Sequence, residues 1–157
     1  MIQSVDQIEK TIADIEAIKQ LKALYAMACD DNYNPKEVSS LFAENAVWDG
    51  GEFGRFEGRS AIRDYFSTVP ELVKWAVHYI SNPVIEVRGD SATGRWYLWQ
   101  PMVLREDSEA VLLGAHYHDE YVKTGGRWLH QNLRLDVKFF APYEHGFGKT
   151  QFLPVPA

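Results

Sequence analysis

His78 is the residue whose type and position most directly indicate chemistry. It lies in Lys74-Trp75-Ala76-Val77-His78-Tyr79-Ile80, an alternating apolar segment that predicts a half-buried strand. Burial disfavours the charged imidazole and a nearby carboxylate favours it, so a histidine in such a place can accept a proton near neutral pH. We therefore regard His78 as a candidate general base. The alternative is a structural histidine that bonds to a backbone carbonyl.

A carboxylate for this base is available at the end of the first predicted helix. Apolar residues recur every three or four positions from about residue 6 to residue 30, namely Ile8, Ile12, Ile15, Ile18, Leu21 and Tyr25. Asp30 and Asp31 then stand at the negative end of the helix macrodipole, where Lys or Arg would be stabilising. Such departures are typical of functional sites, although a solvated acidic loop has the same pattern. The capping pattern Asn34-Pro35-Lys36-Glu37 predicts a second helix, which would hold Asp30 in a tight corner.

Composition limits the classes of protein that fit. The chain has 157 residues, of which 46% are hydrophobic and 13% aromatic, enough for one domain with a core and an apolar pocket. A formal net charge of -6 without a basic run argues against nucleic-acid and membrane partners. The single cysteine, Cys29, cannot form an internal disulfide, and residues 1–10 carry no apolar signal core. We therefore expect a cytoplasmic protein with no membrane span.

Predicted helices precede predicted strands along the chain. A short hairpin around Gly50-Gly51 follows the second helix, and a third helix starts at Gly58 and is followed or ended by Pro70. Four longer strands are predicted at residues 76–87, 92–104, 110–123 and 127–140. Ser81-Asn82-Pro83 predicts a bulge in the first of them. This order predicts an α+β fold in which a strongly curved antiparallel sheet wraps over the helices.

These residues carry a resemblance to a known family. The stretches Asp14–Lys22 and Ala92–Leu98, together with Tyr25, Asp30 and His78, resemble the SnoaL-like branch of the nuclear-transport-factor-2-like (NTF2-like) superfamily. Within that branch the chain is most similar to the bile-acid 7α-dehydratases, scytalone dehydratases and hexachlorocyclohexane dehydrochlorinases. The resemblance implies a cone-shaped α+β barrel, with N-terminal helices packed into a strongly curved and mostly antiparallel sheet.

The resemblance also implies a catalytic set. In these lyases an aspartate at the position of Asp30 orients a histidine at the position of His78, and the dehydratases share a tyrosine at the position of Tyr25. His78 would take a weakly acidic proton and pass it to the leaving hydroxyl, Asp30 would fix its tautomer, and Tyr25 would donate a hydrogen bond. Residues five apart on a regular helix point about 140° apart, so Tyr25 and Asp30 must reach the site from different angles or the helix end must unwind.

Five residues are candidates for contact with the substrate: Trp48, Phe56, Tyr117, Arg134 and Lys138. Trp48 matches a pocket tryptophan of the dehydrochlorinases, and with Phe56 it flanks the expected mouth of the cone, where aromatic walls suit a flat ring. Tyr117 matches a cavity-facing position of the relatives. Arg134 and Lys138 both lie near a basic residue that clamps the substrate in relatives; the sequence does not choose between them, and either can be a solvated edge charge.

Other positions distinguish this chain from its relatives. Trp99-Gln100 stands where the bile-acid enzymes have an acidic residue, and Trp96 replaces the second catalytic histidine of scytalone dehydratase. His116, His118 and Glu120 share one face of a strand, as a metal site would require. In the relatives, however, the alternate residues face the cavity, which places these three on the outer face. We expect no metal and no organic cofactor.

The expected function is that of a cofactor-independent lyase of the dehydratase type, which performs β-elimination on a hydrophobic cyclic or steroid-like small molecule. The family favours a homo-oligomer, with a trimer as the expected state. Two alternatives stay open. One is an isomerase or cyclase that uses the same proton abstraction, and the other is a non-catalytic module, such as the β subunit of a ring-hydroxylating dioxygenase or a ligand-binding adaptor.

The C-terminal residues 141–157 are predicted to form a docked tail of the single domain, residues 1–157. The segment has too many prolines and glycines for a regular element and too many aromatic residues for a solvated tail. It is expected to cover the cavity mouth as a lid or to contact a neighbouring subunit.

Overall fold

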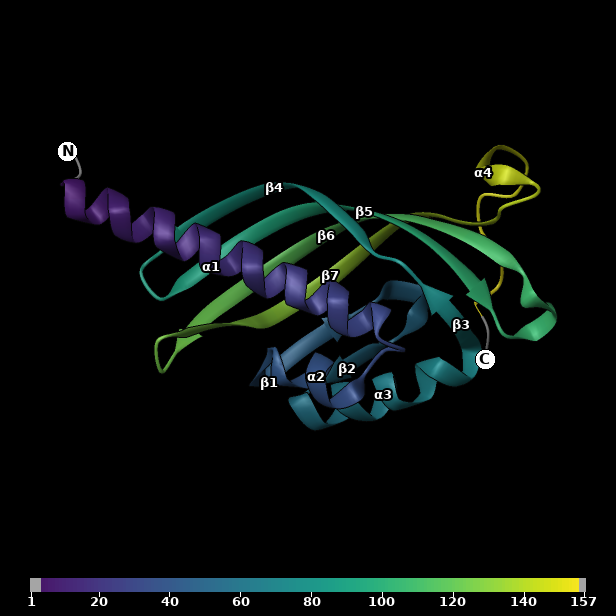
Figure 1. The fold of residues 1–157 in the computed structure, drawn as a ribbon, viewed down its shortest axis with the longest axis horizontal. Helices are drawn as coiled ribbons and strands as arrows, with labels where there is room; N and C mark the ends of the chain where they lie inside the picture. Colours follow the sequence, from purple (N-terminus) through teal and green to yellow (C-terminus); the bar gives the residue numbers. More distant parts are fainter. Residues whose placement is uncertain (1–3, 156–157) are drawn as a thin grey trace.

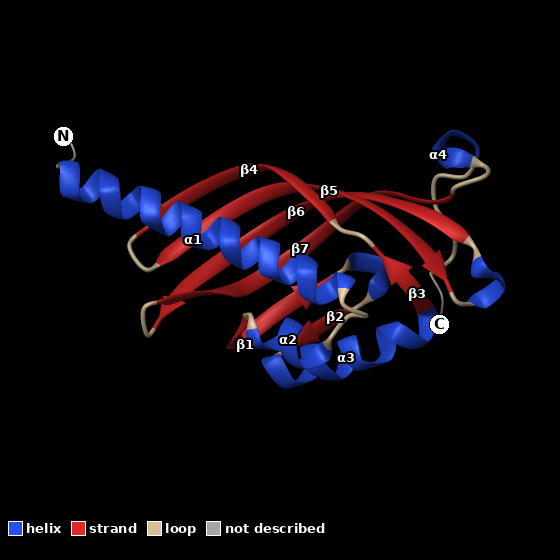
Figure 2. Ribbon diagram, in the orientation of Figure 1, coloured by secondary structure: helices blue, strands red, loops and turns tan. Residues whose placement is uncertain are grey.

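The computed structural model describes residues 4–155, which form a strongly curved seven-stranded sheet with helices packed against it (Figures 1 and 2). The helices are α1 (Val5–Asp30), α2 (Pro35–Ser40), α3 (Arg59–Leu72) and α4 (Gly146–Lys149), with short 3-10 turns at Gly51–Phe53 and Glu106–Ser108. The strands are β1 (Phe42–Asp49), β2 (Arg55–Glu57), β3 (Val73–Ala76), β4 (Tyr79–Arg88), β5 (Ser91–Leu104), β6 (Ala110–Thr124) and β7 (Arg127–Pro142). The predicted α+β class is confirmed.

The sheet is antiparallel at every pairing except one. Its order is β2-β1-β7-β6-β5-β3, with β4 also paired to β5, and β1 runs parallel to β7. α1 lies across one face of this sheet, and α2 and α3 lie near the C-terminal end of α1 (Figure 1). Side chains that are far apart in the sequence therefore meet in space where α1 ends.

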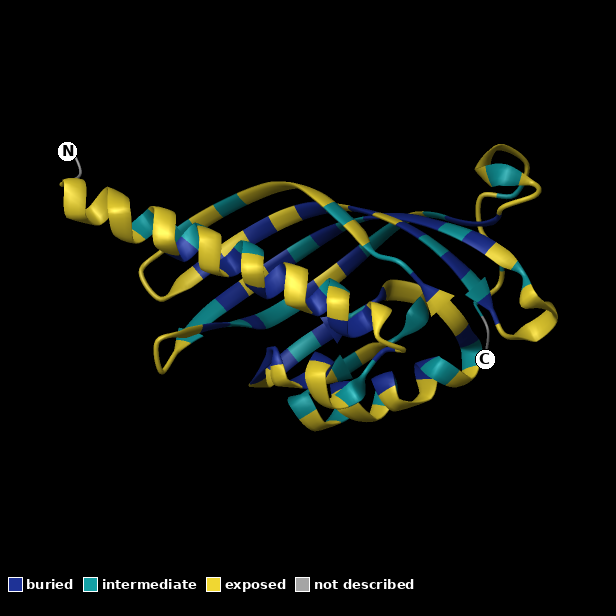
Figure 3. Ribbon diagram, in the orientation of Figure 1, coloured by how far each residue is buried: buried dark blue, intermediate teal, exposed yellow. Residues whose placement is uncertain are grey.

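The buried face of α1 differs from the predicted apolar stripe. Ile8 and Ile12 are 45% and 57% exposed, because the first turns of the helix extend toward solvent (Figure 3). The buried face starts further along, at Asp14, and it also includes the polar residue Lys22. Of the six residues in the predicted apolar stripe, Ile8 and Ile12 therefore lie outside the core.

A polar cluster in the core explains the burial of Lys22. Its ammonium nitrogen lies 2.7 Å from Oδ2 of Asp119, and both side chains are almost fully buried. The Tyr121 hydroxyl donates to the same Oδ2 at 2.7 Å, and Nε1 of Trp96 donates to the Tyr121 oxygen at 2.9 Å. A Cβ at Gly94 would lie only 2.8 Å from Cε2 of Tyr121, so the cluster requires glycine there.

The strand predicted over residues 76–87 is divided in two. His78 lies in the break between β3 and β4, because its backbone N–H donates to the Asp30 carboxylate and not to a neighbouring strand. The bulge predicted at Ser81-Asn82-Pro83 is confirmed: the register with β5 shifts there, and Asn82 has φ +54°. The half-buried strand expected at His78 is thus replaced by an irregular segment fixed by a side chain.

The predicted caps and breaks are close to those of the structure. α2 begins as expected, with Oδ1 of Asn34 accepting from the Glu37 N–H at 3.2 Å and Pro35 in the first turn. Pro70 lies inside the last turn of α3, which ends two residues later at Leu72. Among residues 4–155, no helix is both long enough and apolar enough to cross a bilayer.

Candidate active site

The structure brings His78 and Asp30 together. Nδ1 of His78 lies 2.7 Å from Oδ1 of Asp30, the last residue of α1, and the His78 backbone N–H donates to the same oxygen at 3.0 Å. The imidazole is 5% exposed and the carboxylate 31% exposed. A carboxylate accepts only, so it fixes the proton of the neutral ring on Nδ1. Nε2 is then the nitrogen available to accept another proton.

His78 forms part of the wall of a cavity of about 140 Å³. Aromatic and aliphatic side chains supply most of the lining, and the polar groups include the hydroxyls of Tyr25, Tyr33, Tyr65 and Tyr117. Among residues 4–155, those that line this cavity include no Asp, Glu, Lys or Arg. The site therefore presents one titratable nitrogen and several hydroxyl donors to a neutral ligand.

Tyr25 lies in the same cavity, with its hydroxyl held by a neighbour. Its oxygen accepts from Nε1 of Trp48 at 3.0 Å, and both side chains are buried. Burial raises the pKa of Tyr25 well above its ordinary value, so the hydroxyl keeps its proton and can act as a donor. Asp30 does not line the cavity. It contacts His78 from outside, which removes the geometric conflict expected between Tyr25 and Asp30 on one helix.

The structure places the predicted aromatic contact residues in two layers. Trp48 and Tyr117 line the cavity directly. Phe56 lies behind this layer, stacked on Tyr65 with ring centroids 4.2 Å apart. The ammonium of Lys22 lies 3.4 Å from the Tyr117 ring centroid. Phe56 thus supports the cavity wall and does not form it.

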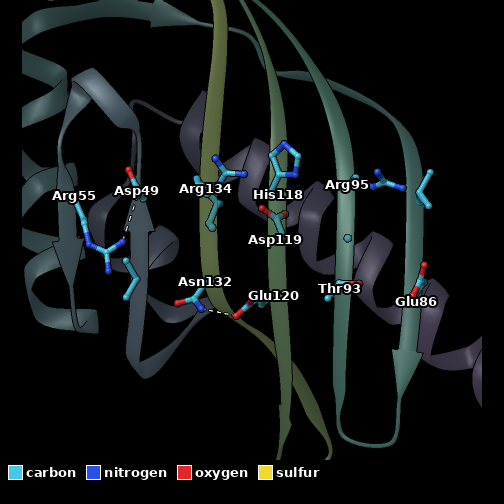
Figure 4. Close-up of a pocket in the computed structure, with 14 residues that line it drawn as sticks. Asp49, Arg55, Glu86, Thr93, Arg95, His118, Asp119, Glu120, Asn132 and Arg134 are labelled. Atoms are coloured by element: carbon cyan, nitrogen blue, oxygen red, sulfur yellow. Dashed lines mark hydrogen bonds and ion pairs between the residues drawn. The ribbon is translucent and has the colours of Figure 1, made fainter.

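Arg134 and Lys138 lie outside the cavity, contrary to the expectation that one of them faces it. Leu133 and Leu135 are buried, so the intervening Arg134 points to the outer face of the sheet, where Figure 4 shows it beside His118. Lys138 is also exposed and forms an ion pair with Asp136 at 2.7 Å. Neither residue can clamp a substrate beside His78 in this structure.

The histidines of β6 lie on the outer face, as the resemblance implied. His116, His118 and Glu120 alternate with the buried residues Tyr117 and Asp119. Figure 4 shows His118 and Glu120 on the side of the sheet opposite α1. Across the part of the chain that the structure describes, no group of three or more His, Cys, Asp or Glu side chains could hold a metal ion.

The C-terminal segment lies along β7 of its own chain. The Phe140 N–H donates to the Gln151 carbonyl at 2.9 Å, and the Leu153 N–H donates to the Phe140 carbonyl at 2.7 Å. This pairing carries the chain to Val155, which forms part of the cavity wall. Residues 156 and 157 of the predicted tail lie outside the described residues.

Deletion of residues 146–157 is expected to weaken ligand binding. Burial of a valine-sized side chain contributes about 1.5 kcal/mol, so loss of the Val155 contact predicts roughly tenfold weaker binding of nitrobenzene, a neutral ring probe. Calorimetry would measure this affinity, and analytical ultracentrifugation would measure the mass of the assembly. Unchanged affinity together with unchanged mass would contradict a role for the tail in the site or in assembly.

The cavity residues that the sequence did not identify include the polar side chains of Tyr33 and Gln100. Tyr33 follows α1 in a turn whose geometry no periodicity predicts. Gln100 was noted only because an acidic residue is absent there. The alternating burial of β5, in which Trp96, Leu98, Gln100 and Met102 all face inward, is a signal that could have identified it.

Comparisons with known proteins agree with this architecture. Residues 10–134 match the family model of the SnoaL-like domain. An uncharacterized protein of Mycobacterium tuberculosis is 30% identical over 119 residues, which are 74% of this chain and 80% of the relative.

Solved structures share the fold at lower identity. A hexachlorocyclohexane dehydrochlorinase, LinA type 2, has a TM-score of 0.79 at 23% identity, over 84% of this chain and 90% of that chain. A provisionally assigned scytalone dehydratase from Novosphingobium aromaticivorans has a TM-score of 0.80 at 21% identity, over 87% and 91%. An NTF2-like superfamily protein of Salmonella enterica has a TM-score of 0.75 at 16% identity, over 81% and 92%. The chain therefore belongs to the SnoaL-like domain family.

Proposed function

We propose that this protein is a cofactor-independent lyase of the dehydratase type, with His78 as its general base. The observation that carries the proposal is the 2.7 Å contact between Nδ1 of His78 and Oδ1 of Asp30, at the wall of a cavity that no Asp, Glu, Lys or Arg of residues 4–155 lines. A neutral imidazole held in one tautomer by a carboxylate is a suitable proton acceptor, and the imidazolium that forms is stabilised by the same carboxylate.

The proposed reaction is a β-elimination. Nε2 of His78 takes a proton from the carbon next to a carbonyl, and the electron pair of that C–H bond forms the enolate. Tyr25 donates a hydrogen bond to the enolate oxygen, which carries the developing charge. The enolate then re-forms the carbonyl, a carbon–carbon double bond forms and the β-hydroxyl leaves. It leaves as water, with the proton returned by His78.

The size and polarity of the cavity indicate a small neutral ring as substrate. A cavity of about 150 Å³ is large enough for benzene, and the present one is about 140 Å³. A steroid-like substrate would need the cavity to expand several-fold, so we narrow the expected substrate class to neutral, single-ring hydroxy ketones. Dehydrochlorinase and dehydratase, the names of two proteins that share this fold, both denote eliminations.

Dehydration of 3-hydroxycyclohexanone to cyclohexenone is a direct test. The product absorbs in the ultraviolet, and in D₂O the loss of water can be compared with deuterium uptake next to the carbonyl. Enzyme-dependent formation of cyclohexenone supports the lyase. Deuterium uptake without loss of water would instead indicate the isomerase alternative. Tight binding of this and related single-ring hydroxy ketones, with neither reaction, would indicate a non-catalytic binding module.

We also infer self-association through the outer face of the sheet. Tyr79, Tyr97 and Trp99 are each between 45% and 60% exposed on neighbouring strands β4 and β5. Exposed aromatic side chains gathered on one face are typical of protein contacts. A homotrimer, which the family favours, stays a prediction that ultracentrifugation can check. The cytoplasmic location expected from the composition stays a prediction that cell fractionation can check.

A further inference from the structure

Tyr33 is held in the cavity by an unusual backbone conformation. Asn32 and Tyr33 both have φ +51°, in the left-handed region that aromatic residues rarely adopt. Such strain persists only where the surroundings impose it, and it is concentrated at functional sites. The turn directs the Tyr33 ring inward, where it stacks on Phe66 with centroids 6.2 Å apart and lies 5.8 Å from the His78 ring. The side chain thereby lines the cavity next to the candidate base.

The oxygen of the Tyr33 hydroxyl accepts one hydrogen bond, and the hydrogen of the same hydroxyl is available for donation. Nε2 of Gln100, which is 4% exposed, donates to the Tyr33 oxygen at 3.2 Å. No side chain within residues 4–155 accepts the Tyr33 hydrogen in return. The Trp48 N–H holds the oxygen of Tyr25 in the same manner. An N–H that occupies a lone pair orients the hydroxyl and strengthens it as a donor.

Burial keeps this hydroxyl protonated. Burial is the main reason why the pKa of Tyr33 lies well above its ordinary value, and the Gln100 hydrogen bond only partly opposes it. Tyr33 therefore cannot serve as an anion or as a base at neutral pH. Its available chemistry is donation of one hydrogen bond into an uncharged cavity.

We propose that Tyr33 is a further catalytic residue, which donates a hydrogen bond to the substrate oxygen on which charge develops, and that Gln100 is the positioning residue that aims it. This inference rests on the lyase proposal for the reaction, but its binding chemistry can be tested separately. It assigns to the site two tyrosine donors, Tyr25 and Tyr33, and it specifies a substrate whose oxygen becomes anionic beside His78.

Binding of 4-nitrophenolate tests the donor directly, because the probe carries an oxygen anion on a single ring. Wild-type protein is expected to bind 4-nitrophenolate more tightly than nitrobenzene at a pH where the free phenol is ionised. Tyr33→Phe keeps the ring that stacks on Phe66 and removes only the hydroxyl. It should weaken 4-nitrophenolate binding by roughly tenfold or more and leave nitrobenzene binding unchanged. Tyr97→Phe, on the outer face, is the matched control and should change neither affinity.

Gln100→Glu tests whether residue 100 donates to Tyr33. A carboxylate at this position can only accept, so it would take the Tyr33 hydrogen and withdraw it from the ligand. The expected result is a loss of 4-nitrophenolate affinity as large as in Tyr33→Phe, with nitrobenzene binding retained. Affinity maintained in Gln100→Glu would show that Tyr33 already donates to residue 100 and would overturn the proposal.

The donor proposal and the lyase proposal fail in different ways. If 3-hydroxycyclohexanone is not dehydrated but Tyr33→Phe still weakens 4-nitrophenolate binding selectively, the role of Tyr33 as a donor is supported and the proposed lyase activity is wrong. If wild-type protein dehydrates the ketone but binds 4-nitrophenolate no more tightly than nitrobenzene, the donor is wrong. Where turnover occurs, Tyr33→Phe should reduce kcat by about 10²-fold with a smaller change in KM. An unchanged kcat would overturn the catalytic role.

Discussion

Replacement of His78 by alanine is expected to slow dehydration of 3-hydroxycyclohexanone by about 10²- to 10⁴-fold, the usual contribution of a positioned general acid–base. The variant should fold, because the His78 backbone N–H that donates to Asp30 is retained. The measurement is kcat/KM from cyclohexenone absorbance, with circular dichroism to verify folding. His116→Ala is the matched control, because His116 lies on the outer face of β6. Wild-type activity in His78→Ala would show that the base lies elsewhere.

Asp30→Asn should reduce the same rate by a comparable factor through a different cause. The asparagine amide can present an N–H to Nδ1 of His78, which would shift the ring proton to Nε2. The imidazole would then have no free nitrogen in the cavity to take the proton of the substrate. Loss of the correct tautomer costs about 10⁴-fold in a hydrolytic triad. Asp31→Asn is the matched control, since Asp31 is the adjacent and exposed carboxylate. Equal rates in Asp30→Asn and Asp31→Asn would contradict the orienting role of Asp30.

Lys22→Met is expected to have the largest effect on stability, with a loss of about 3–5 kcal/mol in the free energy of unfolding. Burial lowers the pKa of Lys22 and raises that of Asp119, and their ion pair opposes both shifts. Without the lysine, Asp119 remains as a buried carboxylate whose Oδ1 has no hydrogen-bond partner among residues 4–155. Urea unfolding monitored by tryptophan fluorescence would measure the change.

Two further variants show whether the ion pair is the cause. Lys19→Met, one turn earlier on α1, removes a lysine that is 40% exposed and should change stability by less than about 0.5 kcal/mol. Asp119→Leu in the Lys22→Met background removes the uncompensated charge and should recover part of the loss. A cost below about 1 kcal/mol for Lys22→Met would mean that the buried pair contributes little.

Local signals in the sequence were sufficient for many of the elements. The end of α1 at Asp30, the Asn34 cap of α2 and the bulge near Asn82 were all predictable, because caps, proline and bulge formers act over a few residues. The position of His78 in a break between two strands was not predictable. Its backbone N–H bonds to a side chain 48 residues away, and no local pattern contains that contact.

The register between β6 and β7 determines which side chains of β7 point toward the cavity. Leu133 and Leu135 are buried, but after a bulge at Lys138 the inward face passes to Phe140, because Phe139 pairs with Gly114 while Val137 pairs with Ala115. A single extra residue inverts which side chains point inward. The sequence could not show whether Arg134, before the bulge, or Lys138, at the bulge, faces the cavity. In the structure neither residue lines it.

By itself, the sequence determined the α+β class, the family and the residue types available for proton transfer, because hydrophobic periodicity and short motifs are properties of neighbouring residues. Only the tertiary structure decided which of them meet. The contact of His78 with Asp30, the support of Tyr33 by Gln100 and a cavity of about 140 Å³ each arise from elements far apart in the chain. Their distances depend on how the curved sheet packs on α1, and close packing of the core fixes that arrangement only in the folded state.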